Sequence, residues 1–194
     1  MGFFSKLFGG KKEKPKCPIC GNEMGFFSKT DISDGAICDK CVARAQALIG
    51  SRLISEMSVE AVKAVIAEED EVNAKLVAAF GGEFPNLFKA ETAFPFSPKT
   101  TDVGIARAKA MKNAVAVKGF VVSGEFDKGP VTVIRPGKTL TAELVEAVPF
   151  DDSGDLEQIT AAHLYKGPVK AGKYAWLILA EGADATSGDL IGIA

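Results

Sequence analysis

Apolar residues recur at three- and four-residue steps in the first half of the chain, a spacing that places them on one helix face. One such stretch follows Cys41, and a second follows Ser58, a suitable helix N-cap, and stops at Gly81-Gly82. The acidic run Glu68–Glu71 interrupts the second stretch, so the pattern predicts two short helices. The run itself suits a solvated turn or, alternatively, an acidic docking surface.

From about residue 112 the pattern changes to short runs of β-branched and aromatic residues separated by glycines. Such runs, beginning around Val115–Val122, predict the strands of a small barrel. Between the helices and the strands, residues 83–99 carry three prolines, which exclude a long helix, among five large apolar side chains. We expect this segment to be a connector packed on one or both domains.

The N-terminal segment 1–16 combines apolar and basic side chains. Phe3, Phe4, Leu7 and Phe8 share one face of a short helix, and four lysines follow at positions 11–16. This composition suits an anionic membrane surface or a partner groove, although a frayed or internally packed terminus has the same pattern. The hexapeptide MGFFSK recurs at 24–29, where we expect Phe26 and Phe27 to cover the metal site described below.

Composition narrows the class of protein. The chain has 194 residues, 47% of them hydrophobic and 25% charged, and a net charge of −2. These values exclude general disorder and argue against a general nucleic-acid coat protein, and no apolar run is long enough to cross a membrane. Residues 1–50 are net basic and residues 51–95 net acidic. This asymmetry indicates functionally distinct parts.

The four cysteines form two knuckles. They are Cys17 and Cys20 in CPIC, and Cys38 and Cys41 in CDKC, with 17 residues between the pairs. Two residues between thiolates allow both sulfurs to face one cation, and two such knuckles complete a tetrahedron. Asp34-Gly35 predicts a hairpin turn before the second knuckle. We expect a structural Zn²⁺ site without an open position for water or substrate.

Three alternatives to a zinc site exist for these cysteines. Two disulfides fit poorly, because there is no secretory signal and every cysteine lies in a knuckle. A redox dithiol usually accompanies a βαβ pattern, which is lacking. Iron in the same four-sulfur cage is chemically allowed.

The first 50 residues resemble a bacterial family of small zinc-knuckle domains of unknown function. The resemblance rests on MGFFSKLFG, the lysines that follow it, CPICG, and the DGAICDKC stretch that begins at Asp34. It implies a bacterial cytoplasmic protein, with a membrane-peripheral location left open, and supplies no activity.

The C-terminal part resembles the second domain of translation elongation GTPases, a six-stranded Greek-key barrel. The similar stretches are residues 119–131, 139–146, 169–179 and 188–191. The chain departs from that family because no GTPase domain precedes the barrel and no phosphate-binding loop is present: Thr132 stands where the first glycine of such a loop would precede Gly137-Lys138-Thr139. We therefore expect no nucleotide. No basic cluster with exposed aromatics marks the barrel in the sequence.

Other candidates favour structural roles. His163, the only histidine, has no nucleophile near it in the sequence, and the acidic loop Asp151–Asp155 lacks the spacing of a calcium loop. Trp176 alternates within an apolar strand and is expected in the core. Ser123, Glu125 and Asp127 do not suggest a catalytic triad. No catalytic residue is assigned.

The predicted fold is α+β: a basic tip (1–16), a four-cysteine zinc ribbon (17–50), a short helical connector (51–93) and a six-stranded Greek-key barrel (94–194). The predicted function is a non-enzymatic zinc-binding interaction or adaptor protein with an unknown protein partner. The alternative is an RNA-binding protein that uses the basic head and the translation-type barrel.

Overall fold

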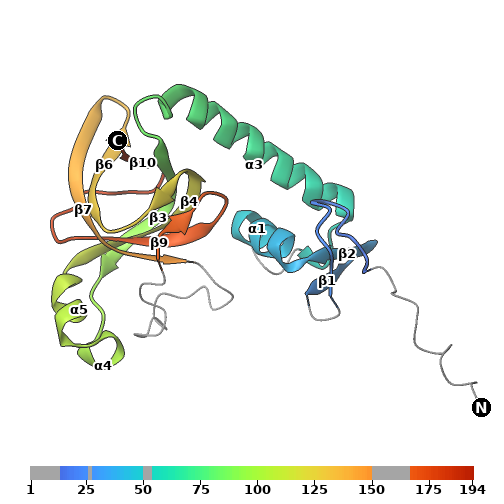
Figure 1. Ribbon diagram of the computed structural model, residues 1–194, viewed down its shortest axis with the longest axis horizontal. Coiled ribbons are helices and arrows are strands. Elements are labelled where there is room, and N and C mark those ends of the chain that lie inside the picture. Colours follow the sequence, from blue (N-terminus) through green and yellow to red (C-terminus); the bar gives the residue numbers. More distant parts are fainter. Residues whose placement is uncertain (1–13, 26–27, 50–53, 150–166) are drawn as a thin grey trace, which may run out of the picture. The chain divides into compact units, whose positions relative to one another are not determined.

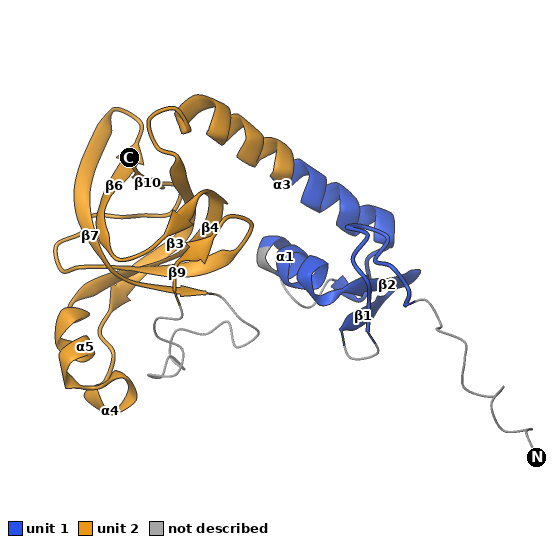
Figure 2. Ribbon diagram, viewed as in Figure 1, with its two compact units in different colours: residues 1–69 blue, residues 70–194 orange. Residues whose placement is uncertain are grey.

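The computed structural model describes residues 14–25, 28–49, 54–149 and 167–194. The chain forms two compact units, residues 1–69 and 70–194, and the boundary between them falls inside helix α3 (Val59–Phe80) (Figure 2). None of the helices in the described segments combines the length and hydrophobicity that a membrane crossing requires.

Unit 1 is built on a hairpin followed by a helix. Strands β1 (Lys29–Ile32) and β2 (Gly35–Cys38) pair antiparallel, and α1 (Asp39–Ile49) follows β2 directly (Figure 1). Ile32 pairs with Gly35, so Ser33 and Asp34 form the loop and Gly35 is the first residue of β2. The predicted hairpin is therefore confirmed, with its turn one residue earlier than expected.

The start of α3 is fixed by two side chains. Ser58 Oγ accepts a hydrogen bond from the Ala61 N–H (3.1 Å), which confirms Ser58 as the predicted N-cap. Asp34 Oδ1 in the hairpin loop accepts a hydrogen bond from the Val59 N–H (2.7 Å). A carboxylate at a helix N-terminus also favours the helix electrostatically. These contacts attach the hairpin to the helix within unit 1.

Helix α3 is continuous over 22 residues, so the prediction of two short helices is wrong. Its more buried positions follow a single helical stripe from end to end: Val62, Ile66, Glu69, Asn73, Leu76 and Phe80. Polar residues occupy the middle of that stripe, which breaks the apolar pattern without breaking the helix. Glutamates are also good helix formers, and Lys75 Nζ lies 2.6 Å from Glu71 Oε1 one turn away.

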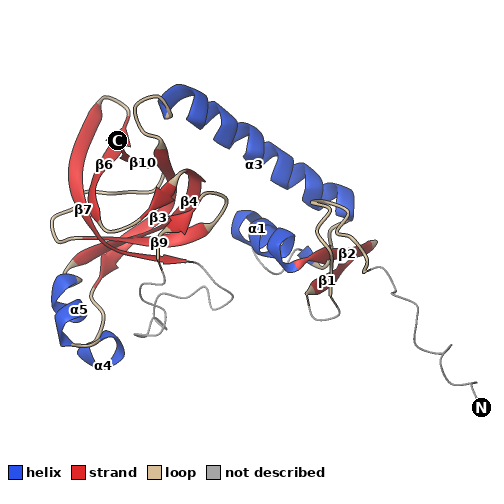
Figure 3. Cartoon of the chain, viewed as in Figure 1, coloured by secondary structure: helices blue, strands red, loops and turns tan. Residues whose placement is uncertain are grey.

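Unit 2 contains a closed antiparallel barrel of six strands (Figure 3). The barrel strands are β3 (Asn86–Phe96), β4 (Ala114–Ser123), β6 (Gly129–Arg135), β7 (Lys138–Pro149), β9 (Tyr174–Leu179) and β10 (Leu190–Ile193). Their order around the barrel is β10-β3-β4-β9-β7-β6, and β6 closes it on β10. Because β4 lies beside β9 rather than β6, the order is that of a Greek key, as predicted. A short pair, β5 (Glu125–Phe126) and β8 (Val169–Lys170), lies outside the barrel sheet.

Strand β3 corrects the prediction of a connector at residues 83–99. It pairs with β10 through Asn86–Lys89 and with β4 along nearly its whole length. Pro95 lies beyond the part that β10 covers, so its missing N–H removes no bond on that side. The expected domain boundary at residues 93–94 lies within this strand.

The barrel interior holds the larger hydrophobic core, which includes Phe88, Phe126 and Leu177. A second cluster lies where the short helices α4 (Thr100–Val103) and α5 (Ile105–Ala110) pack on the sheet. Trp176 is 7% exposed and belongs to this second cluster, which confirms that it is a core residue.

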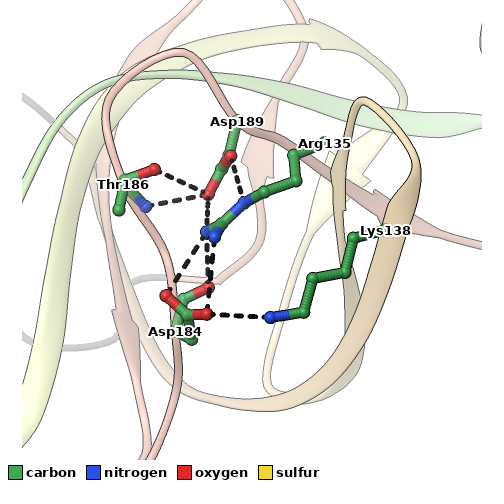
Figure 4. A network of polar contacts seen from close by, with 5 residues as sticks. All are labelled: Arg135, Lys138, Asp184, Thr186 and Asp189. Atoms are coloured by element: carbon green, nitrogen blue, oxygen red, sulfur yellow. Dashed lines mark hydrogen bonds and ion pairs between the residues drawn. The ribbon is translucent and has the colours of Figure 1, made fainter.

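A polar network ties the segment before β10 to the β6–β7 hairpin (Figure 4). The Arg135 guanidinium donates to both carboxylate oxygens of buried Asp189, at 3.0 Å from Nε and 2.7 Å from Nη2. Asp189 also accepts the Thr186 N–H at 2.8 Å. The Asp184 carboxylate makes longer contacts of 3.4 Å to Arg135 and Lys138, and the Asp184 carbonyl accepts a hydrogen bond from Arg135 Nη2 at 3.0 Å.

Candidate metal centre

The first knuckle is a tight loop stabilised by its own backbone. Lys16 and Glu23 form a β-bridge, the Cys17 N–H donates to the Asn22 carbonyl (2.8 Å), and the Gly21 N–H donates to the Cys17 carbonyl (2.9 Å). Gly21 has a φ of +74°, a conformation that glycine adopts without the strain of a side chain. The CPICG sequence therefore folds both cysteines toward the same side.

The second knuckle joins a strand to a helix. Cys38 is the last residue of β2 and Cys41 lies in the first turn of α1. The Cys38 N–H points at Cys17 Sγ across the site, at 3.4 Å. The hairpin thus carries the second pair of sulfurs to the first pair.

All four sulfurs gather within 4.8 Å of one another. Cys17 Sγ lies 3.8 Å from Cys41 Sγ, and Cys20 Sγ lies 3.5 Å from Cys38 Sγ. A tetrahedron with metal–sulfur bonds of about 2.3 Å has sulfur–sulfur edges of about 3.8 Å, which these distances match. Disulfide bonds need sulfurs about 2.05 Å apart, and the four cysteines are free thiols.

The thiols differ in their electrostatic surroundings. Burial opposes the charged form of Cys17, but hydrogen bonds from the N–H groups of Cys38, Cys20 and Ile19 outweigh it and lower the pKa of Cys17 to about 6. Burial raises the pKa of Cys38 and of Cys41, and contacts with neighbouring thiols add to this effect. Ionisation of the buried thiols Cys38 and Cys41 therefore requires a nearby cation to balance their charge.

The site is continuous with the core of unit 1. Cys17, Cys38 and Cys41 are buried and belong to one hydrophobic cluster with residues such as Ile37 and Val62, whereas Cys20 is exposed. Each of the four cysteines offers one sulfur, and four sulfurs are enough to complete a tetrahedral shell. The arrangement can hold one metal ion and join the knuckles, the hairpin and α1 around it.

Several predicted features lie outside the described residues. These are Phe3, Phe4, Leu7 and Phe8 of the tip, Phe26 and Phe27, the acidic loop Asp151–Asp155, and His163. Their predicted roles are neither supported nor contradicted by the structure.

A basic surface on unit 2 was not among the features predicted from the sequence. Lys99, Arg107, Lys109 and Lys112 lie on or beside α4 and α5, and Ile105 among them is 79% exposed. A signal was present, because residues 97–118 contain five basic residues and one acidic residue. The C-terminal part as a whole is nearly neutral, so its net charge does not reveal this local excess of basic residues.

Together, the fold and the site define a small cysteine-rich unit with a candidate metal centre, followed in the chain by a six-stranded antiparallel barrel. Residues 15–63 match the family described as "Domain of unknown function (DUF4428)", and this match contains all four cysteines. The matched segment ends within α3, so it does not include the barrel. No curated protein matches the chain.

Proposed function

We propose that this protein is a non-enzymatic, zinc-stabilised interaction protein of the bacterial cytoplasm. The observation that carries the proposal is the four-sulfur cluster, whose sulfur–sulfur distances suit a closed tetrahedral site. With four protein ligands, a metal has no position for water or substrate and acts on folding rather than on chemistry. The metal would therefore stabilise the fold of unit 1, which in turn would present a surface to a partner.

Zinc is the metal that best suits this site. It prefers tetrahedral thiolate coordination and has no redox chemistry that would destabilise its ligands. Elemental analysis of protein purified without added metal should give one zinc per chain. Stoichiometric iron with visible colour, or metal-free protein with four reactive thiols, would contradict zinc.

The interaction role follows from the pairing of this unit with a barrel. The likeness of the barrel to the second domain of translation GTPases supports a binding role for it, because small barrels of that kind present surfaces to other macromolecules. Residues 1–16 would add a contact to a protein partner or an anionic membrane surface.

Affinity capture from the native host tests the interaction role. The full chain should retain a specific partner, and Cys38→Ser should lose partners bound by the zinc unit, because one missing thiolate opens the site. A Ser33→Ala variant, at an exposed position in the loop of the same hairpin and outside the metal ligands, is the matched control. Capture of nothing by the wild-type chain would count against an adaptor.

RNA binding is the second candidate, and the basic excess of residues 1–50 is the observation that favours it. It requires a salt-dependent mobility shift of labelled RNA by the full chain that is lost when residues 1–16 are deleted. A shift that does not depend on salt or on residues 1–16 would argue against it.

A further inference from the structure

The α4–α5 corner of unit 2 concentrates positive charge. Lys99 precedes α4, Arg107 and Lys109 lie on α5, and Lys112 lies in the turn after it. Asp102 is the only acidic residue between positions 97 and 118, and the fold adds Glu181, whose Oε1 accepts a hydrogen bond from Asn113 Nδ2 (2.8 Å) beside Lys112. None of the four cations forms an ion pair in the part of the chain that the structure describes. Lys99, Lys109 and Lys112 are exposed to solvent, whereas Arg107 is half-buried.

The same corner exposes an apolar side chain. Gly104, with a φ of +84°, joins the two helices, and Ile105 begins α5 with 79% of its surface exposed. Lys109 follows one turn later on the same side of the helix. Ala108 and Met111 point inward and attach the corner to the barrel through the second hydrophobic cluster.

We propose that this corner, formed by Lys99, Ile105, Lys109 and Lys112, docks on an anionic lipid bilayer. The lysines would contact the negative headgroups, and the aliphatic side chain would enter the hydrocarbon boundary below them, as in interfacial helices. This contact lies in unit 2 and does not depend on the proposed role of the N-terminal tip. A peripheral protein needs two weak membrane signals for stable attachment, and the corner supplies one.

Ile105 favours a bilayer over nucleic acid. Proteins that bind single strands stack bases on aromatic rings, and α5 carries none. The exposed ring nearest in sequence, Phe94, is already engaged edge-on with Trp176, with ring centroids 5.5 Å apart. The exposed Ile105 side chain would instead leave water by entering the headgroup–acyl boundary of a bilayer.

The test is co-sedimentation of the full chain with vesicles of phosphatidylcholine alone or mixed with phosphatidylglycerol. Lys109→Gln/Lys112→Gln should lower partitioning onto the mixed vesicles on the order of tenfold, and high salt should do the same. Ile105→Ser should lower it several-fold at unchanged charge. Neutral vesicles should bind weakly.

Lys170→Gln/Lys173→Gln is the matched control. It removes the same charge from two exposed lysines near the other end of the β4–β9 pair, where Phe120 pairs with Tyr174. That end lies roughly 17 Å along the sheet from Val115, at about 3.3 Å per residue. The control should bind like the wild type, and all variants should keep its circular dichroism and melting temperature.

Each variant is also made with Lys6, Lys11, Lys12 and Lys14 changed to glutamine, which separates this corner from the tip. If the tip does not bind membranes, the four tip substitutions leave vesicle binding unchanged, while the corner variants still bind vesicles more weakly than the wild type. If the corner variants bind like the wild type in both backgrounds, the proposal is wrong. It is equally wrong if Ile105→Ser has no effect and the same lysines instead bind an RNA oligonucleotide.

Discussion

At the scale of single residues, the barrel depends on contacts between positions far apart in the sequence. Asp189 is 3% exposed and is stabilised as a carboxylate by Arg135, 54 residues away, and by the Thr186 N–H. Gly119 lies in β4, where the chain passes close to Phe88 and Lys89 of β3. Neither residue has a local sequence signature.

The Asp189 carboxylate should make stability depend on pH. Burial by itself would raise its pKa, but hydrogen bonds from Arg135 and Thr186 outweigh it, so its pKa in the folded protein lies below its ordinary value of 3.8. The resulting stability is present above that ordinary value and is lost as pH falls through the lower folded value. Thermal melts from neutral pH to pH about 2 should show this loss.

Asp189→Asn should lower the melting temperature at neutral pH and flatten this acid limb. Asp184→Asn is the control, because its contacts are 3.4 Å long and its side chain is 53% exposed, so its effect should be smaller. If the melting temperature of Asp189→Asn falls with decreasing pH as steeply as that of the wild type, other carboxylates cause the loss of stability in acid.

Gly119→Ala should destabilise the barrel by about 1–3 kcal/mol, because a methyl group there overlaps the Lys89 carbonyl and the Phe88 ring. Gly82→Ala is the matched control, since a methyl group at Gly82 meets nothing within 4 Å. Urea unfolding measures both. Equal stability of the two variants would mean that β3 and β4 can separate at little cost.

At the scale of elements, the main differences from expectation lie at α3 and β3. Polar residues within the buried stripe of α3 broke the apolar pattern, and Pro95 in β3 with Pro85 and Pro98 on either side of it masked a strand. In both cases the burial of the element, rather than its residue types alone, decided its extent. Capping and turn preferences predicted the helix start at Ser58 and the β1–β2 hairpin correctly, because these features depend on neighbouring residues.

The extent of β3 predicts where the barrel can be cut. A fragment of residues 70–194 retains β3 and the α3 side chains Leu76 and Phe80 that pack near Phe84, so it should unfold cooperatively. A fragment of residues 94–194 lacks most of β3 and all of its pairing with β10, so the barrel cannot close and should not fold. Circular dichroism melts compare the two. Cooperative folding of the shorter fragment would show that β3 is dispensable.

At the scale of the whole molecule, stability is divided between two units with different chemistry. Unit 1 has a small core that includes three of the cysteines, whereas unit 2 has an extensive apolar core and no cysteine. Small domains with few buried residues commonly depend on a metal for their stability. The two units should therefore respond differently to loss of metal.

Chelation should unfold unit 1 and leave the barrel intact. The only tryptophan of the chain, Trp176, lies in unit 2, so its fluorescence reports barrel unfolding, while helical circular dichroism also reports α1. A strong chelator with reductant should lower the helical signal and leave the tryptophan transition unchanged. Cys41→Ser should reproduce this result without chelator. A large shift of the tryptophan transition would show that the barrel depends on the metal unit.

The sequence by itself pointed to the four-cysteine cluster that could hold a metal ion, the hairpin within it, the Ser58 cap and a six-stranded barrel. The first three follow from knuckle spacing, turn residues and capping, which act within a few residues. Strand periodicity predicts a small barrel, and its six strands were implied by the resemblance to the second domain of translation GTPases. The tertiary structure decided the continuity of α3, the place of β3 in the barrel, the Arg135–Asp189 pair and the exposed basic corner around Ile105. Each of these depends on which distant segment packs against a residue, and that packing sets its burial, its charge partners and its exposure to solvent.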